Sequence, residues 1–369
     1  MASPSVIDIE ALLAPISESA PAGANPRSDT SPTSPYFKLK DARSAARAAE
    51  RRADSEGGET GTLPEWETIL AMAPQLLTST GKDLEITAWY IEALVRAHGF
   101  AGFRDGCLLT QGLCDRYWDT LHSLQDDDGL ATRLAPLAGL NGVEGEGTLI
   151  QPLRKVAITI ESEYGPFSAY HYEQAFALSQ IADVAVRTRR EEAAAVTLAK
   201  FTATVVASGG PFYINLLEDL SGAAKAFETL TATLDAKAGD ASPPSSAIHD
   251  LLGSIADTVR AVSKDLVARY VQSQVPAETV AAGETAPTES NAPSGAPRGR
   301  EEALQQLLRV ADYFKQSEPH SPISTTLEEA VRRARLPFSD LLAELLPDTA
   351  AWRAALTNAG IKPPPPAKT

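Results

Sequence analysis

Cysteine is scarce in this sequence, and its two cysteines are not spaced to form a bridge. Among 369 residues only Cys107 and Cys114 are cysteines, and they lie seven positions apart in a segment with helical periodicity. Both therefore lie on one helix face, roughly 10 Å apart along the axis. A disulfide needs Cα atoms closer than about 7 Å. We expect two small core residues in a reducing compartment, not a disulfide framework.

The sequence also lacks long apolar runs, and its basic residues are fewer than its acidic ones. No run of about 20 apolar residues occurs, so we expect no membrane-spanning helix. The first twenty residues are acidic and lack the basic and apolar regions of a secretory signal peptide, which predicts a cytoplasmic protein. A formal net charge of −15 disfavours binding to nucleic acids and anionic membranes. Local basic patches at 51–52 and 332–335 are typical of solvated helix faces.

Aromatic residues make up only 6% of the chain, whereas alanine and leucine, which favour helices, are abundant. Residues 84–98 show the i, i+4, i+7 apolar pattern of an amphipathic helix, with Asp83 as its N-cap. Gly99 is predicted to end this helix, and a second helical pattern follows at once, which indicates an antiparallel helical hairpin. The sequence therefore predicts an all-α protein.

Changes in composition divide the chain. The most distinct boundary is segment 275–299, which is rich in Pro, Ala, Gly, Ser and Thr and is predicted to be a flexible linker. We expect an N-terminal helical domain at 1–155, a middle helical bundle at 156–274, a small helical domain at 300–360 and a disordered tail at 361–369. Two details are predicted with this layout: a short strand at 153–160 and one long helix over 183–208.

No residue pattern in the sequence is typical of catalysis or of a bound cofactor or metal. Segment 79–83, STGKD, is similar to the end of a phosphate-binding loop, but Leu76 replaces its upstream glycine and Asp83 replaces its Mg²⁺-binding Ser or Thr. The acidic run 126–129 fails as a calcium loop because Leu130 occupies the third ligand position. The five histidines lack zinc-site spacing. We expect a non-enzymatic protein with no cofactor, metal or small-molecule substrate.

Three stretches carry a more specific pattern. Segment 12–27, LLAPISESAPAGANPR, places a short helix before P-I-S-x-x-x-P-x-G, and residues 300–345 contain A-D-Y-F-x-x-x-E-P-x-S-P. Between them, 63–129 combines a Trp-containing helix, Lys-Asp-Leu, a glycine hairpin and R-Y-W-D-x-L-H. Taken in chain order, the three stretches resemble the ImpA/TssA family of subunits of the bacterial type VI secretion system. The matching positions are Trp66, Lys82, Asp83, Leu84, Trp89, Gly99, Gly102, Tyr117, Trp118 and His122.

The resemblance implies a structural assembly protein. Family members associate with the baseplate and the membrane complex and help to start or cap the polymerising tail tube and sheath. They are often ring-shaped homo-oligomers built by the C-terminal region. For this chain the resemblance implies a cytoplasmic scaffold, peripherally associated with the inner-membrane secretion complex. It implies other secretion components and copies of itself as partners.

Two groups of candidate residues follow. In the N-terminal domain Trp118 could anchor a partner, but packing in the core is the favoured interpretation, and the predicted core residues are Trp66, Trp89, Tyr117 and Trp118. In the C-terminal domain, residues 318–322 are either an assembly contact or a turn between two helices in which Ser321 caps the second helix. The apolar faces of segments 303–314 and 327–346 favour a self-association patch. The predicted interaction residues there are Glu318, Pro319, His320, Ser321, Pro322, Leu304, Leu308 and Phe314.

Two other functions stay open at this point. A monomeric helical adaptor or chaperone would bind partner helices in a groove. A hydrolase whose catalytic residues meet only in three dimensions would show a cleft with titratable groups of perturbed pKa.

Overall fold

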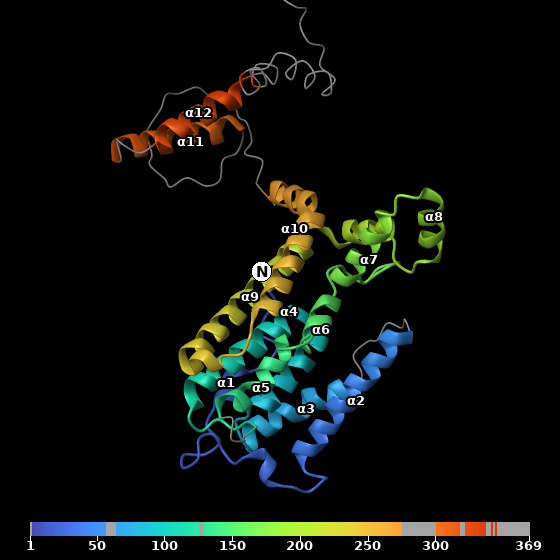
Figure 1. Ribbon diagram of the computed structural model, residues 1–369, viewed down its shortest axis with the longest axis vertical. Helices are drawn as coiled ribbons and strands as arrows, with labels where there is room; N and C mark the ends of the chain where they lie inside the picture. Colours follow the sequence, from blue (N-terminus) through green and yellow to red (C-terminus); the bar gives the residue numbers. More distant parts are fainter. Residues whose placement is uncertain are drawn as a thin grey trace, which may run out of the picture. The chain divides into compact units, whose positions relative to one another are not determined.

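The computed structural model describes residues 2–56, 64–124, 129–274, 300–317 and 322–336, together with Leu341 and Glu344. These residues form twelve α-helices and two 3-10 helices, with isolated β-bridges but no β-strand among them (Figure 1). The predicted all-α class is therefore confirmed. By their contacts the residues divide into two compact units, Met1–Glu278 and Thr279–Thr369. The predicted linker at 275–299 and tail at 361–369 lie outside the described residues.

The first unit begins with four helical segments: α1 (Ile9–Leu13), η1 (Pro26–Ser28), α2 (Pro35–Glu56) and α3 (Pro64–Ser79). Asp8 caps α1 by accepting a hydrogen bond from the Ala11 amide. Helix α3 packs on both α2 and α4. The sequence predicts a kink or a break at Pro74, but α3 runs through it without interruption to Ser79.

Helix α4 (Leu84–Tyr117) is a hairpin of two helices joined at Gly99, as the sequence predicts. Gly99 has a φ of 56°, a backbone conformation that favours glycine. The second half folds back along the first, so that Gly102 lies against the backbone of Leu94 and Gly106 lies against Ile91. Small residues at these positions let the two helices approach closely.

The rest of the unit contains α5 (Leu130–Asn141), α6 (Ile150–Lys155), α7 (Ala169–Ser179), α8 (Val184–Ala193), α9 (Leu198–Ala238), η2 (Gly239–Ala241) and α10 (Ser246–Gln274). Two predictions are wrong here. Of the strand expected at 153–160, residues 153–155 are the end of helix α6, and only Ala157 forms a β-bridge, to Ser168. The long helix expected over 183–208 is broken into α8 and the start of α9, because Thr197 caps a new helix through the Lys200 amide.

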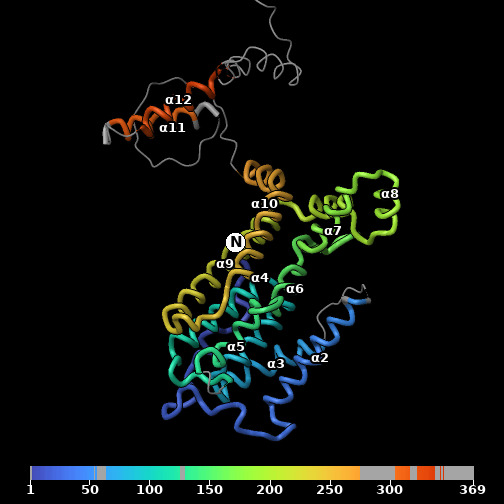
Figure 2. Tube along the Cα trace, viewed as in Figure 1, coloured from blue at the N-terminus to red at the C-terminus, as the bar shows by residue number. Residues whose placement is uncertain are grey.

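Helix α9 connects the early and late parts of this unit. It packs against both α4 and α10, and Figure 2 shows α10 returning beside it. Gly209, with a φ of 74°, breaks the regular helix near its middle. The next residue, Gly210, faces Tyr270 of α10, and a Cβ built there would lie 2.4 Å from the Tyr270 Cβ. This close contact fixes where α9 and α10 cross.

We predict that Gly102→Ala lowers the stability of the protein. The added methyl would lie 2.2 Å from the Leu94 carbonyl oxygen, so the two halves of α4 must separate. Overpacking of this kind costs about 1–3 kcal/mol. Gly139→Ala is the matched control, because Gly139 lies within α5 with no atom within 4 Å of its added methyl. Alanine should stabilise that helix by up to about 1 kcal/mol. Urea denaturation measures both, and equal effects of the two changes would contradict the hairpin packing.

Candidate functional site

A buried lysine lies where the N-terminal signature segment, residues 12–27, meets the start of α4. The Lys82 side chain is fully buried, and its Nζ donates hydrogen bonds to the carbonyl oxygens of Leu12 (2.7 Å) and Leu77 (2.8 Å). Leu77 lies near the carboxyl end of α3, where the helix dipole favours a positive charge. The ammonium therefore ties α1 to the end of α3. Burial lowers the pKa of Lys82 to about 8.

The neighbouring Asp83 is also fully buried and has two functions in the fold. One carboxylate oxygen caps α4 by accepting from the Ile86 amide at 3.0 Å. Both oxygens accept from Arg27, at 2.5 and 3.2 Å, and Arg27 also contacts Glu85 at 2.5 Å. The Tyr36 hydroxyl donates to the same Glu85 carboxylate at 2.6 Å. Burial and the bond to Glu85 raise the pKa of Tyr36, so this hydroxyl stays a donor at neutral pH.

His122, which follows the second half of the α4 hairpin, contacts both the N-terminal signature segment and the start of α4. Its backbone amide donates to Lys82, its carbonyl accepts from Leu84, and its ring Nε2 lies 3.1 Å from the Gly23 carbonyl oxygen. Residues that match the ImpA/TssA pattern at three separate places in the sequence thus meet in one hydrogen-bonded cluster. The pattern describes a structural junction.

A second polar network joins α2 to the first half of α4. Arg43 forms a two-point ion pair with the fully buried Glu92, at 2.6 and 2.9 Å. Arg96 pairs in the same way with Glu50, and its guanidinium lies 3.8 Å from the ring centre of Trp66. The indole of Trp66 donates to that Glu50 carboxylate at 2.9 Å. Paired arginine and carboxylate groups on buried faces lock the register of the two helices.

The predicted core residues divide between full and partial burial. Trp66, Trp89 and Tyr117 are buried, and the Tyr117 hydroxyl donates to the Leu13 carbonyl at 2.6 Å. Trp118 is only half-buried against the core, with the Arg133 guanidinium 4.9 Å and the Lys237 ammonium 5.7 Å from its ring centres. Cation–π contacts cover much of its surface, which favours packing over partner anchoring for Trp118.

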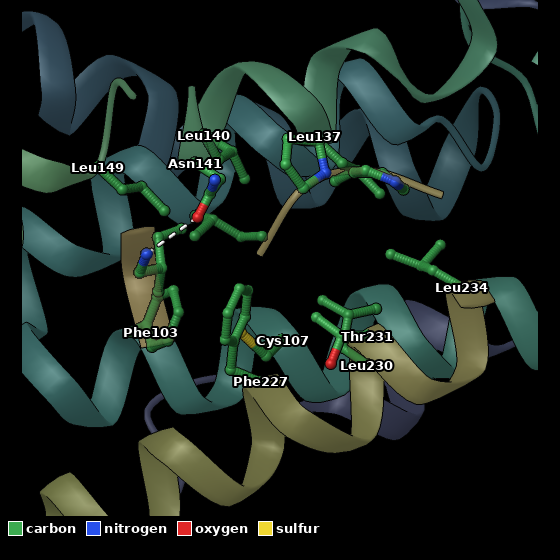
Figure 3. A pocket seen from close by; sticks show the side chains of 14 residues that line it. Phe103, Cys107, Leu137, Leu140, Asn141, Leu149, Phe227, Leu230, Thr231 and Leu234 are labelled. Carbon is green, nitrogen blue, oxygen red and sulfur yellow. Dashed lines mark hydrogen bonds between the residues drawn. The ribbon is translucent and has the colours of Figure 1, made fainter. Parts of the chain in front are cut away.

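An internal cavity lies between α4, α5 and α9 (Figure 3). Its volume is about 30 Å³, far below the roughly 300–1,000 Å³ of small-molecule sites. Aliphatic and aromatic side chains dominate its lining, and Asn141 points its amide oxygen to the Ile248 amide at 2.9 Å. Cys107 is the one titratable residue in this lining, and burial raises the pKa of its thiol. A protonated buried thiol is not a nucleophile at neutral pH.

Across the described ranges, no three His, Cys, Asp or Glu side chains come together in a way that could hold a metal ion. None of the described helices is by itself long and apolar enough to cross a membrane. The bent pair Val184–Ala193 and Leu198–Ala241 meets the length and composition criteria only when taken together.

The second unit contains α11 (Arg300–Ser317) and α12 (Ile323–Arg335), which pack on each other. Leu304, Ala311 and Val331 are buried, and the predicted interaction residues Leu308 and Phe314 are half-buried. Of the predicted turn, Pro322 is exposed and takes the N-cap position of α12, one place later than the sequence suggests. Glu318, Pro319, His320 and Ser321 lie outside the described residues.

An apolar stripe remains on the outer side of α11. Leu307 and Val310 are 38% and 44% exposed, and Phe314 follows them at the i, i+3, i+7 spacing of one helix face. We call Leu307, Val310 and Phe314 the α11 stripe. The basic patch on α12 is different, because Arg332 and Arg333 both pair with Glu329 and Glu344. Among the described residues of the second unit, the α11 stripe is thus an exposed apolar surface beside the buried face of the same helix.

In the described structure, polar side chains join the helices to one another. Known proteins with a similar sequence or fold are components of type VI secretion systems. Residues 13–142 match the family model of the ImpA N-terminal domain of type VI secretion systems. The chain is 26% identical to the type VI secretion system component TssA1 of Pseudomonas aeruginosa, over 93% of this chain and 96% of TssA1.

A solved structure shares the fold. It is the N-terminal domain, including the conserved ImpA_N region, of the TssA component from Burkholderia cenocepacia. The match has a TM-score of 0.58 at 24% identity and covers 72% of this chain and 98% of that one. The resemblance that the sequence motifs predict is thus confirmed, over residues 13–142 by the ImpA N-terminal family model and over nearly the whole chain by the similarity to TssA1.

The polar networks around Arg27, Arg43 and Arg96 are not among the features predicted from the sequence. A signal for one of them exists in the sequence. Arg43 and Glu50 are seven residues apart on α2, and Glu92 and Arg96 are four apart on α4, so opposite charges meet when the two helices lie side by side. No comparable local signal marks Arg27, whose partners are more than fifty positions away.

We predict a specific pH dependence for the buried lysine. Its pKa is about 8 in the folded protein and 10.5 in an unfolded chain, so the unfolded state binds more protons between these values. The free energy of unfolding should therefore rise from pH 8 to 10.5 relative to Lys82→Met, which cannot titrate. Urea denaturation of both proteins over this range measures the difference. The exposed Lys38→Met serves as control and should show a constant difference; a constant difference for Lys82→Met would contradict the account.

Proposed function

We propose that this chain is a non-enzymatic scaffold of the type VI secretion machine, acting at the baseplate and in the initiation or capping of tail tube and sheath polymerisation. The observation that carries the proposal is the match to TssA1, which extends over nearly the whole of both chains. The small apolar cavity, whose one titratable residue is a protonated thiol, supports a structural protein over an enzyme. Its place is the cytoplasmic side of the inner-membrane secretion complex.

Self-association through the second unit is the next part of the proposal. The α11–α12 pair is small, and domains of this size bury too little apolar surface to be very stable alone. The α11 stripe leaves Leu307 and Val310 exposed beside the buried face of the same helix. Copies of the chain that each bury this stripe against a different surface of the neighbouring copy form a closed homo-oligomer, which we propose is a ring. The turn residues Glu318, Pro319, His320, Ser321 and Pro322 belong to this proposed interface.

The oligomeric state tests this proposal. Size-exclusion chromatography with light scattering should show a large closed oligomer for the full chain and a monomer for a chain ending at Val275. In the full chain, the double change Leu307→Ser and Val310→Ser should shift the mass to smaller species because it removes the apolar surface. Val271→Ser is the control, since Val271 is 52% exposed on α10 in the first unit.

A monomeric full chain at micromolar concentration would contradict self-association and favour the adaptor, in which the α11 stripe binds a partner helix. The same double variant, placed in the bacterium with a fluorescent sheath protein, tests the role in assembly. Fewer assembled sheaths than with Val271→Ser are expected. Normal sheath assembly by a variant that no longer self-associates would contradict the proposed function.

A further inference from the structure

A row of basic side chains runs along one side of α2. Lys40, Arg47 and Arg51 lie at i, i+7 and i+11, next to the buried face that contains Leu39 and Ala46. At about 1.5 Å per residue the row is roughly 16 Å long. We call these three residues the α2 basic stripe. It is a concentrated positive feature on a chain whose formal net charge is −15.

Arg47, at the centre of the stripe, has no acceptor. Its side chain is half-buried, yet no hydrogen bond or ion pair joins it to any described residue. The two nearby carboxylates are already engaged, Glu92 by Arg43 and Glu50 by Arg96. Partial burial of an arginine without a partner costs free energy, so the folded chain gains nothing from this charge.

The neighbourhood of Arg47 is dominated by positive charge. Burial lowers the pKa of Arg47, Glu92 opposes this effect, and Arg43, Arg51 and Arg96 reinforce it. Arg43 and Arg96 are held in place by their carboxylates and by the rings of Trp89 and Trp66 beneath them. The stripe therefore borders a surface on which, among the described residues, arginines outnumber the carboxylates that pair with them.

This differs from the other basic patch. On α12 the guanidinium groups of Arg332 and Arg333 are satisfied by Glu329 and Glu344, as expected for a solvated helix face with its own ion pairs. On α2, the half-buried Arg47 and the exposed Arg51 form no ion pair with a described carboxylate, and Glu50, three residues after Arg47, is engaged by Arg96. Among the described residues, the α2 basic stripe is therefore free to accept carboxylates from a partner.

We propose that the α2 basic stripe is a docking surface for an acidic segment of a partner protein, whose carboxylates pair with Arg47 and Arg51. Arginine binds carboxylates at two points, and partial burial strengthens such pairs. The three cations of the stripe match one short acidic segment, whereas a nucleic acid or an anionic membrane presents an extended array of negative charge to the whole surface, which the net charge of −15 repels. The inference rests on the proposed scaffold function, since a scaffold must hold partners.

The test measures binding of two synthetic helical peptides to the full-length protein by fluorescence anisotropy. One peptide carries four Glu residues on one face at i, i+4, i+7 and i+11, and the other carries Gln at the same positions. We expect saturable binding of the Glu peptide only. The double variant Arg47→Gln and Arg51→Gln should bind it about tenfold more weakly. The control variant Lys38→Gln and Arg52→Gln removes the same charge from the opposite, exposed side of α2 and should change the affinity less than about twofold.

Several results would overturn the proposal. They are the absence of saturable binding, an equal loss in the control variant, or stronger stripe-dependent binding of phosphatidylglycerol vesicles or of an RNA oligonucleotide. Thermal unfolding adds a separate check: the Arg47→Gln and Arg51→Gln variant should keep or raise the melting temperature, and a fall would show a structural role instead. Light scattering on the same samples reports the oligomeric state, so loss of peptide binding and loss of self-association are distinct results.

Discussion

The first unit depends on a single buried positive charge. The ammonium of Lys82 is held by carbonyl oxygens from α1 and from the end of α3, and the next residue, Asp83, starts α4 and binds Arg27. Three chain segments meet there within hydrogen-bonding distance. A buried lysine is tolerated only if its donors are satisfied, so the position of each acceptor is constrained. The placement of the N-terminal signature segment on the α4 hairpin follows from this constraint.

Other buried or half-buried charged side chains also hold segments of the first unit together. Arg43–Glu92 and Arg96–Glu50 fix α2 on α4, while Asp105 and Asp219 hold the N-terminal residues by accepting from Val6 at 2.6 Å and from Ser3 at 2.7 Å. Ion pairs at the helix contacts give the first unit a fixed geometry, which suits a platform for partners. In the described part of the second unit, Arg332 and Arg333 pair with Glu329 and Glu344, and apolar side chains of α11 stay exposed. The proposed self-association therefore belongs to a different unit from the ion-paired helix contacts.

Much of the architecture could be predicted from local signals. Asp83 as N-cap and Gly99 as helix terminator correctly placed the α4 hairpin, and the motifs in 12–27 and 63–129 correctly indicated the ImpA/TssA relationship. Predictions failed where a short segment has an ambiguous period, as in α6, or where one capping threonine outweighs helical composition, as Thr197 does before α9. The networks around Arg27 and Arg43 depend on contacts between distant residues, which a single sequence does not reveal. The unpaired state of Arg47 could be recognised only once its neighbours were placed.

Amide hydrogen exchange measured by mass spectrometry tests the central claim, that Lys82 and Asp83 join the N-terminal signature segment to α4. Segments in one cooperative unit exchange with similar free energies of opening. The account predicts that peptides from 12–27 are protected to a similar degree as peptides from α4, and that Lys82→Met raises exchange in 12–27 and at the end of α3 first. Rapid exchange of 12–27 in the unmodified protein, beside a protected α4, would contradict it.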